Sequence, residues 1–309
     1  MKNLLKRGLG LLITLGFLAW ILSSGVRWHD SLTSLLGLNP LALALAILAF
    51  ASTYLLRAGR VYDEFRATPG VRFASILRLT LVHNAMINIL PFRSGEAAFP
   101  VLLARWFNVP STRAVVALLW LRIQDAFVVL ALAAFVWPGL HPALRVLWIG
   151  GVVVAAWLIP AWAARHPEIE TQSGRFAASV HKIREALAES TQNNGRGWLW
   201  TLANWSLKLL AEAWLLAALL SISLSSGLAG ALGVELASIL PIQGVAGFGT
   251  YEAGGAALLR THGITFQQGL NAALALHLFV IACSLIAGGL AAALLPGTPS
   301  TADNNTPST

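Results

Sequence analysis

Long runs of apolar residues, separated by short polar segments, constrain this chain more than any other feature of its sequence. About 20 apolar residues in a helix cross the hydrocarbon core of a bilayer, and several runs reach or approach that length. Of the 309 residues, 57% are hydrophobic and 11% are charged, whereas soluble domains are about 25% charged. The sequence therefore predicts an all-α, polytopic membrane protein.

The basic excess is interpreted as a signal of membrane topology. A net charge of +8 would suggest a nucleic-acid partner for a soluble protein, but in a membrane protein Lys and Arg gather in cytoplasmic loops. We therefore expect no nucleic-acid partner. The single cysteine, Cys283, excludes an intrachain disulfide and a thiol redox pair within this sequence.

Six full crossings are predicted, at residues 8–26, 40–56, 115–137, 145–163, 198–220 and 269–295. Lys2, Lys6 and Arg7 precede the first run, which is longer than a typical signal-peptide core and has no Ala-x-Ala cleavage site. We therefore interpret it as a membrane helix with a cytoplasmic N-terminus. The basic segment after residue 56 is predicted to be a cytoplasmic loop.

Two halves are predicted, residues 1–163 and 198–295. Between them, residues 164–197 are polar and basic, which predicts a cytoplasmic linker with an amphipathic helix. Residues 296–309 are predicted to be a disordered tail, and the C-terminus is predicted to be cytoplasmic.

Two further apolar segments are too short to cross. The arms 79–90 and 97–104 flank a break at 91–96 and would reach about 18 Å and 12 Å, against a hydrocarbon core of about 30 Å. Because both flanks are predicted to be cytoplasmic, residues 73–107 are predicted to form a re-entrant hairpin. Residues 227–260, broken at 241–249, are predicted to form a second one that enters from the opposite face.

The two hairpins resemble each other in sequence. Arg105 and Arg260 lie 155 positions apart, as do Arg122 and His277. Each break begins with Leu-Pro and is followed by Glu-Ala. We predict an inverted repeat, an architecture in which broken helices form a substrate site near the membrane midplane. Chance similarity between two segments rich in Leu and Ala is the alternative.

Charged residues within apolar segments need a partner or water, because each is costly in the hydrocarbon. Arg122 and Asp125 are three positions apart, and Lys208 and Glu212 are four apart, so each pair can form on one helical face. Both a structural ion pair and a substrate contact stay open for these residues. Glu235 has no local basic partner and is expected to face the same cavity.

The broken tips are candidate head-group sites. A helix terminus with free N–H groups and an arginine both favour phosphate. The alternative is that Arg93 and Glu96 pair only with each other and with Arg122 or Lys208. The candidate substrate-binding residues are Arg93, Ser94, Gly95, Glu96, Arg122, Asp125, Lys208, Glu212, Gln243, Gly247, Gly249 and Glu252.

The sequence contains no recognisable catalytic motif. No cluster of His, Cys and carboxylate residues has metal-ligand spacing, and no nucleophile motif or dinucleotide fingerprint occurs. We therefore expect neither a metal, a cofactor nor an enzymatic activity.

Three motifs in order resemble a known family. They are the stretches at 88–96 (NILPFRSGE), 121–125 (LRIQD) and 240–253 (LPIQGVAGFGTYEA). Together they resemble the flippase-like transmembrane family of lysylphosphatidylglycerol synthases and their stand-alone relatives, over about residues 8–295. Family members often carry Arg three positions after the tip glutamate. Here that residue is Phe99, so Arg93 or Arg105 is expected to take over its role.

The resemblance implies a multi-pass protein of the bacterial inner membrane that moves an anionic or glycosylated lipid between leaflets. The soluble synthase domain of larger family members is absent from this sequence, so synthase activity is not expected. Two other functions stay open: a non-transporting partner of a separate lipid-modifying enzyme, and a small-solute transporter. The lipid, the energy source and the oligomeric state are not predicted.

Overall fold

A computed structural model of the chain describes residues 28–137, 139–164, 185–191, 194–239 and 245–295. These residues are mostly helical and include no strand, in agreement with the predicted all-α class. The predicted first crossing, most of the linker and the tail lie outside the described residues. Within the linker, residues 185–191 are helical.

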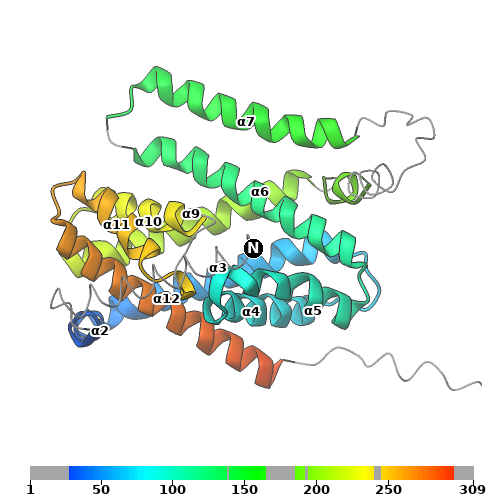
Figure 1. Cartoon of the computed structure of the whole chain (residues 1–309), viewed down its shortest axis with the longest axis horizontal. Helices are drawn as coiled ribbons and strands as arrows, with labels where there is room; N and C mark the ends of the chain where they lie inside the picture. The colour runs from blue at the N-terminus through cyan, green and yellow to red at the C-terminus, as the bar shows by residue number, and fades with distance from the viewer. Residues whose placement is uncertain (1–27, 138, 165–184, 192–193, 240–244, 296–309) are drawn as a thin grey trace, which may run out of the picture.

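Four helices are long and apolar enough to cross a membrane: α3 (Pro40–Phe65), α6 (Ser111–Val136), α9 (Asn194–Leu220) and α12 (Phe266–Leu294). A shorter helix, α2 (Trp28–Leu36), precedes them. Another helix, α7 (Pro142–Ala164), coincides with the predicted crossing 145–163 and lies beside α6 at one edge of the molecule (Figure 1). The number of crossings stays a prediction.

Helix ends follow local sequence signals. Before α3, the Asn39 side chain accepts a hydrogen bond from the Leu41 N–H, and Pro40 occupies the first helical position, where its missing N–H costs nothing. Before α12, Thr265 and Gln268 cap each other's backbone N–H groups.

The helix that contains the second predicted crossing is longer than that crossing. The sequence predicts a loop after residue 56, but α3 continues to Phe65, so Arg57 and Arg60 lie within the helix and not in a loop. No Gly-Pro break interrupts the helix there, and Arg60 is buried. A charged residue does not end a helix when the fold supplies it with partners.

The first predicted hairpin comprises α4 (Phe73–Ile89), a 3₁₀ helix η1 (Pro91–Ala97) and α5 (Ala98–Phe107). Its first arm begins six residues earlier than expected, because the helix accommodates Arg78. The Arg78 guanidinium donates to the Ala292 carbonyl oxygen at 3.1 Å and lies 5.2 Å from the centroid of the Trp106 ring. The pair α4 and α5 is therefore connected at a broken tip, as the sequence predicted.

The second predicted hairpin comprises α10 (Leu224–Ile239), a short 3₁₀ turn η2 (Val245–Gly247) and α11 (Thr250–Arg260). The two helices pack at glycines: a Cβ added to Gly233 would lie 2.3 Å from the Gly254 carbonyl oxygen, and one added to Gly254 would lie 2.5 Å from the Gly233 oxygen. Small residues allow this backbone contact.

A long helix, two shorter helices and a second long helix occur in this order twice. In the first half α3, α4, α5 and α6 have 26, 17, 10 and 26 residues. In the second half α9, α10, α11 and α12 have 27, 16, 11 and 29 residues. The first residues of α3 and α9 are 154 positions apart, and those of α6 and α12 are 155 apart. The element order thus repeats at nearly the predicted offset.

Candidate functional site

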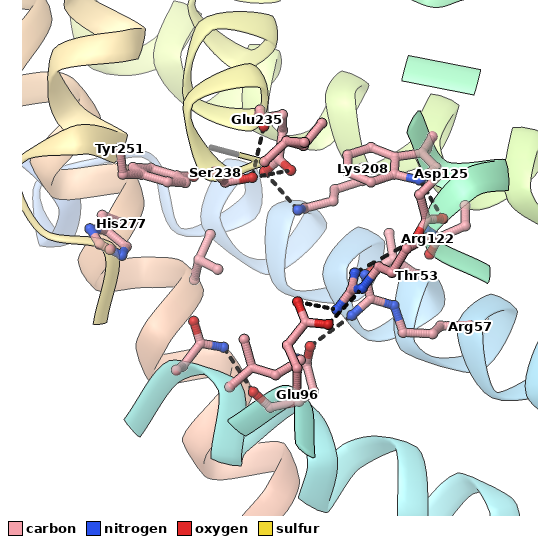
Figure 2. A pocket seen from close by; sticks show the side chains of 18 of the residues that line it. Thr53, Arg57, Glu96, Arg122, Asp125, Lys208, Glu235, Ser238, Tyr251 and His277 are labelled. Carbon is pink, nitrogen blue, oxygen red and sulfur yellow. Dashed lines mark hydrogen bonds and ion pairs between the residues drawn. The ribbon is translucent and has the colours of Figure 1, made fainter. Parts of the chain in front are cut away.

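A polar cavity of about 680 Å³ lies where both broken tips face the long helices. Residues from α3, α4, η1, α6, α9, α10, η2, α11 and α12 line it, so both halves of the chain contribute to one cavity. Figure 2 shows charged side chains from separate helices pointing toward this shared space. Its ionisable lining residues are Tyr54, Arg57, Glu96, Arg122, Asp125, Lys208, Glu235, Tyr251 and His277.

Asp125 on α6 is the anchor of one charge cluster. One carboxylate oxygen, Oδ1, accepts hydrogen bonds from Arg60 Nη1 at 2.6 Å and Trp205 Nε1 at 2.9 Å. The other, Oδ2, lies 3.6 Å from Arg122 Nη1. The predicted Arg122–Asp125 pair therefore exists, but the closest cation to Asp125 is Arg60, which is 65 positions away in sequence.

Arg122 pairs more closely with the first tip. Its Nη2 lies 3.1 Å from Glu96 Oε1, and its Nε donates to Glu96 Oε2 at 3.2 Å. This geometry is a two-point ion pair between an arginine and a carboxylate. The ion pair connects η1 to α6. It agrees with the alternative given in the sequence analysis, in which Glu96 pairs with Arg122.

Lys208 on α9 lies between two carboxylates. Its Nζ is 2.6 Å from Glu235 Oε1 and 3.7 Å from Glu212 Oε1. The predicted Lys208–Glu212 pair is thus present at the longer distance, while Glu235, which lacked a local partner in sequence, is the closer one. Lys208 Nζ also lies 4.9 Å from the centroid of the Trp205 ring.

Arg57 on α3 is a cavity residue that the sequence analysis missed, because the predicted crossing ended one residue before it. Its Nη1 donates to the amide oxygen of Asn84 at 2.8 Å. Among the described residues no carboxylate lies within ion-pair distance of Arg57, in contrast to the other cavity cations Arg122 and Lys208. The side-chain hydrogen bond of Arg57 is therefore made to a neutral group.

The second tip is held by a buried carboxylate–histidine pair. Glu252 Oε1 lies 2.6 Å from His277 Nδ1, and Oε2 accepts from the Gly249 N–H at 2.7 Å. The His277 ring stacks on Tyr251 with 4.3 Å between centroids. Gly249 has a φ of 91°, a conformation that a residue with a side chain rarely adopts.

The two tips are connected to the following long helix in the same way. Glu96 pairs with Arg122 in the first half, and Glu252 pairs with His277 in the second. Arg122 and His277 are the residues that the sequence aligned at an offset of 155. Each tip glutamate thus contacts the aligned position of the next long helix.

The predicted site residues divide into three groups. Glu96, Arg122, Asp125, Lys208 and Gly247 line the cavity. Glu212, Glu252 and Gly249 lie beside it, while Ser94 is exposed and Gly95 packs on α4, where an added Cβ would lie 2.4 Å from the Met86 oxygen.

Two of the predicted site residues cannot be assigned to these groups, and Phe99 replaces the arginine that the family often has. The Arg93 side chain and all of Gln243 fall outside the described parts of the chain. Phe99, which stands where the family often has Arg, is buried in an apolar cluster. Arg105, one of its two expected replacements, is exposed at the end of α5 and does not line the cavity.

Comparisons with known proteins place the chain in a family. No curated protein and no solved structure matches it. The family model of the lysylphosphatidylglycerol synthase TM region, in contrast, matches residues 8–288. This is most of the chain, and it agrees with the resemblance based on the three motifs. The chain therefore belongs to the lysylphosphatidylglycerol synthase TM-region family of membrane proteins.

Proposed function

We propose that this protein is a lipid translocase that moves an anionic or glycosylated head group between leaflets through the cavity, while the acyl chains stay in the bilayer. Family membership supports a role in lipid metabolism at a membrane. The observation that carries the proposal is Arg57, a cavity-lining arginine that donates a hydrogen bond to the neutral amide of Asn84. We propose no catalytic step for this chain.

The chemistry of Arg57 favours a phosphate ligand. A guanidinium offers paired donors that fit phosphate oxygens, and its charge is worth more in a site of low dielectric constant. Asn84 occupies one donor and leaves the remaining donors for a ligand. The cavity volume of about 680 Å³ falls within the range of about 300 to 1,000 Å³ that small-molecule sites have, which suits a head group without its acyl chains.

The repeated arrangement of the two halves supports a transport mechanism. We propose that α4 with α5, and α10 with α11, are re-entrant hairpins of an inverted repeat, and that the cavity opens alternately to each leaflet. The equivalent pairs Glu96–Arg122 and Glu252–His277 support this symmetry. We place the protein in the bacterial inner membrane with both termini in the cytoplasm.

Leaflet exchange in liposomes tests the proposal. The purified protein is reconstituted into vesicles of phosphatidylcholine and phosphatidylglycerol. A trace of fluorescent phosphatidylglycerol or fluorescent phosphatidylcholine is added, and dithionite quenching measures the fraction of the fluorescent lipid in the outer leaflet. We expect wild-type protein to speed phosphatidylglycerol exchange. Arg57→Gln should abolish this gain, and Arg57→Lys should restore part of it, because an ammonium lacks the two-point fork.

Arg66→Gln is the matched control, because the Arg66 side chain is 44% exposed and lies outside the cavity. It should exchange lipid like wild type, and all variants should elute as folded protein in detergent. Wild-type protein that exchanges neither lipid would refute the translocase and favour a non-transporting partner of a lipid-modifying enzyme. Equal loss of exchange in Arg66→Gln would refute the role assigned to Arg57.

A further inference from the structure

Glu212 is a fully buried carboxylate with an incomplete set of partners. Its side chain is 0% exposed, and neither carboxylate oxygen has a hydrogen-bond partner among the described residues. The nearest cation, Lys208, is 3.7 Å away and makes its short contact, at 2.6 Å, with Glu235. One ammonium therefore serves two buried carboxylates.

A buried carboxylate without hydrogen bonds is costly, and proteins avoid the cost by protonating it. Where two carboxylates share one site, their repulsion favours a proton on one of them. The short contact of Lys208 is made with Glu235 and not with Glu212. Of the two carboxylates, Glu212 is therefore the one without a short contact to a cation.

The charge balance of the cavity connects Glu212 to Arg57. Apart from the Glu252–His277 pair, the described residues in and beside the cavity include four cations and four carboxylates: Arg57, Arg60, Arg122 and Lys208 against Glu96, Asp125, Glu212 and Glu235. With Glu212 ionised the group is neutral, and with Glu212 protonated it carries one positive charge. An anion at Arg57 and a proton on Glu212 therefore restore neutrality together.

Sequence position also connects the two residues. Glu212 lies 155 positions after Arg57, the offset that relates the two halves, so each long helix carries one of them at the equivalent place. Tyr54, one turn before Arg57 and lining the cavity, interacts electrostatically with both charges. The proton site and the proposed anion site are thus both close to Tyr54.

We propose that Glu212 is a proton-binding site that couples head-group movement to protons, with one proton bound for each monoanionic phosphate held at Arg57. This inference rests on the proposed translocase function. When the head group enters, the Glu212 carboxylate takes a proton from water; when the head group leaves, that proton returns to water on the side where the lipid is released. No net charge then crosses the membrane.

Ionisable groups from each helix that packs on α9 line the cavity beside Glu212. They are Tyr54 and Arg57 from α3, Arg122 and Asp125 from α6, Glu235 from α10 and His277 from α12, with Lys208 on α9 itself and Tyr251 on α11. The carboxylate of Asp125 and the imidazole of His277 already hold short contacts to Arg60 and Glu252. Glu212 differs from both in having no such contact.

A pH gradient across the vesicles of the previous section tests the coupling. Without a pH gradient, fluorescent phosphatidylglycerol should reach the same density in both leaflets. With one pH unit across the membrane, one-to-one coupling predicts enrichment of up to about tenfold in the leaflet on the alkaline side, because one unit is a tenfold proton ratio. A protonophore should abolish the enrichment.

Glu212→Gln, which mimics the protonated acid in shape, should end at the same distribution with and without the gradient. Glu189→Gln is the control, since the Glu189 side chain is 61% exposed in the linker, and it should respond like wild type. Wild-type exchange that ignores the pH gradient, or follows a sodium gradient instead, would overturn the coupling and leave the translocase intact. If no lipid exchange occurs under any condition, both the translocase function and the proton coupling are refuted.

Discussion

Replacing Asp125 by Asn should destabilise the protein by stranding Arg60. The Arg60 side chain is 6% exposed and has Asp125 as its anionic partner at 2.6 Å, while Arg122 keeps Glu96. Of the two arginines, only Arg60 therefore loses its anionic partner. Removing one partner of a buried pair costs roughly 3 to 5 kcal/mol. Because Arg60 still donates to Gln124 and to the Leu121 carbonyl oxygen, we expect a loss near the lower limit, about 3 kcal/mol.

The double variant Arg60→Met with Asp125→Asn removes both charges and should be milder. It leaves two neutral acceptors, Gln124 Oε1 and the Leu121 oxygen, each worth about 1 kcal/mol when a bond is lost. We expect a total loss of about 2 kcal/mol. Unfolding by sodium dodecyl sulfate in mixed micelles, followed by tryptophan fluorescence, measures the free energies of all variants.

Asp30→Asn is the control for this cycle, because the Asp30 side chain is 63% exposed on α2 and its replacement should change stability by less than about 0.5 kcal/mol. A double variant that is at least as destabilised as Asp125→Asn would refute the reasoning. Asp125 would then stabilise the fold through Trp205 or packing and not by compensating the charge of Arg60.

Two further predictions concern the first tip. Gly95→Ala should lower the yield of folded protein, because the added Cβ would lie 2.4 Å from the Met86 oxygen, whereas Gly150→Ala, with nothing within 4 Å, should fold normally; size-exclusion profiles compare them. On a Cys283→Ser background, a cysteine at Trp137 should react with an impermeant maleimide from the periplasm, and one at Ser94 should not. Reaction of both at equal rates would exclude a re-entrant hairpin.

The local ion pairs and the helix breaks could be predicted because their causes lie within a few positions of sequence. Arg122–Asp125 and Lys208–Glu212 follow from helical spacing, and Pro91 marks a break that the structure has as the start of η1. Each predicted pair is nevertheless the longer contact of its cluster. The shorter ones, such as Lys208–Glu235, join different helices, and helical spacing carries no information about them.

Arg57 was missed for a different physical reason. A hydropathy run ends at the first charged residue, since an isolated charge is costly in the bilayer. That cost disappears when another helix supplies partners, as Asn84 and Asp125 do for the arginines of α3. Consequently, the hydropathy count assigned Arg57, which lines the cavity, to a loop.

The glycine contact between α10 and α11 has a mechanical consequence. Backbones that touch at Gly233 and Gly254 have no intervening side chains whose rotation could let the helices slide. The two helices should therefore move as one rigid lever, and deformation should concentrate at its joints with α9 and α12. Ser221 and Gly263 lie at those joints with φ angles of 53° and 82°, and they are the positions where a hinge would have to turn.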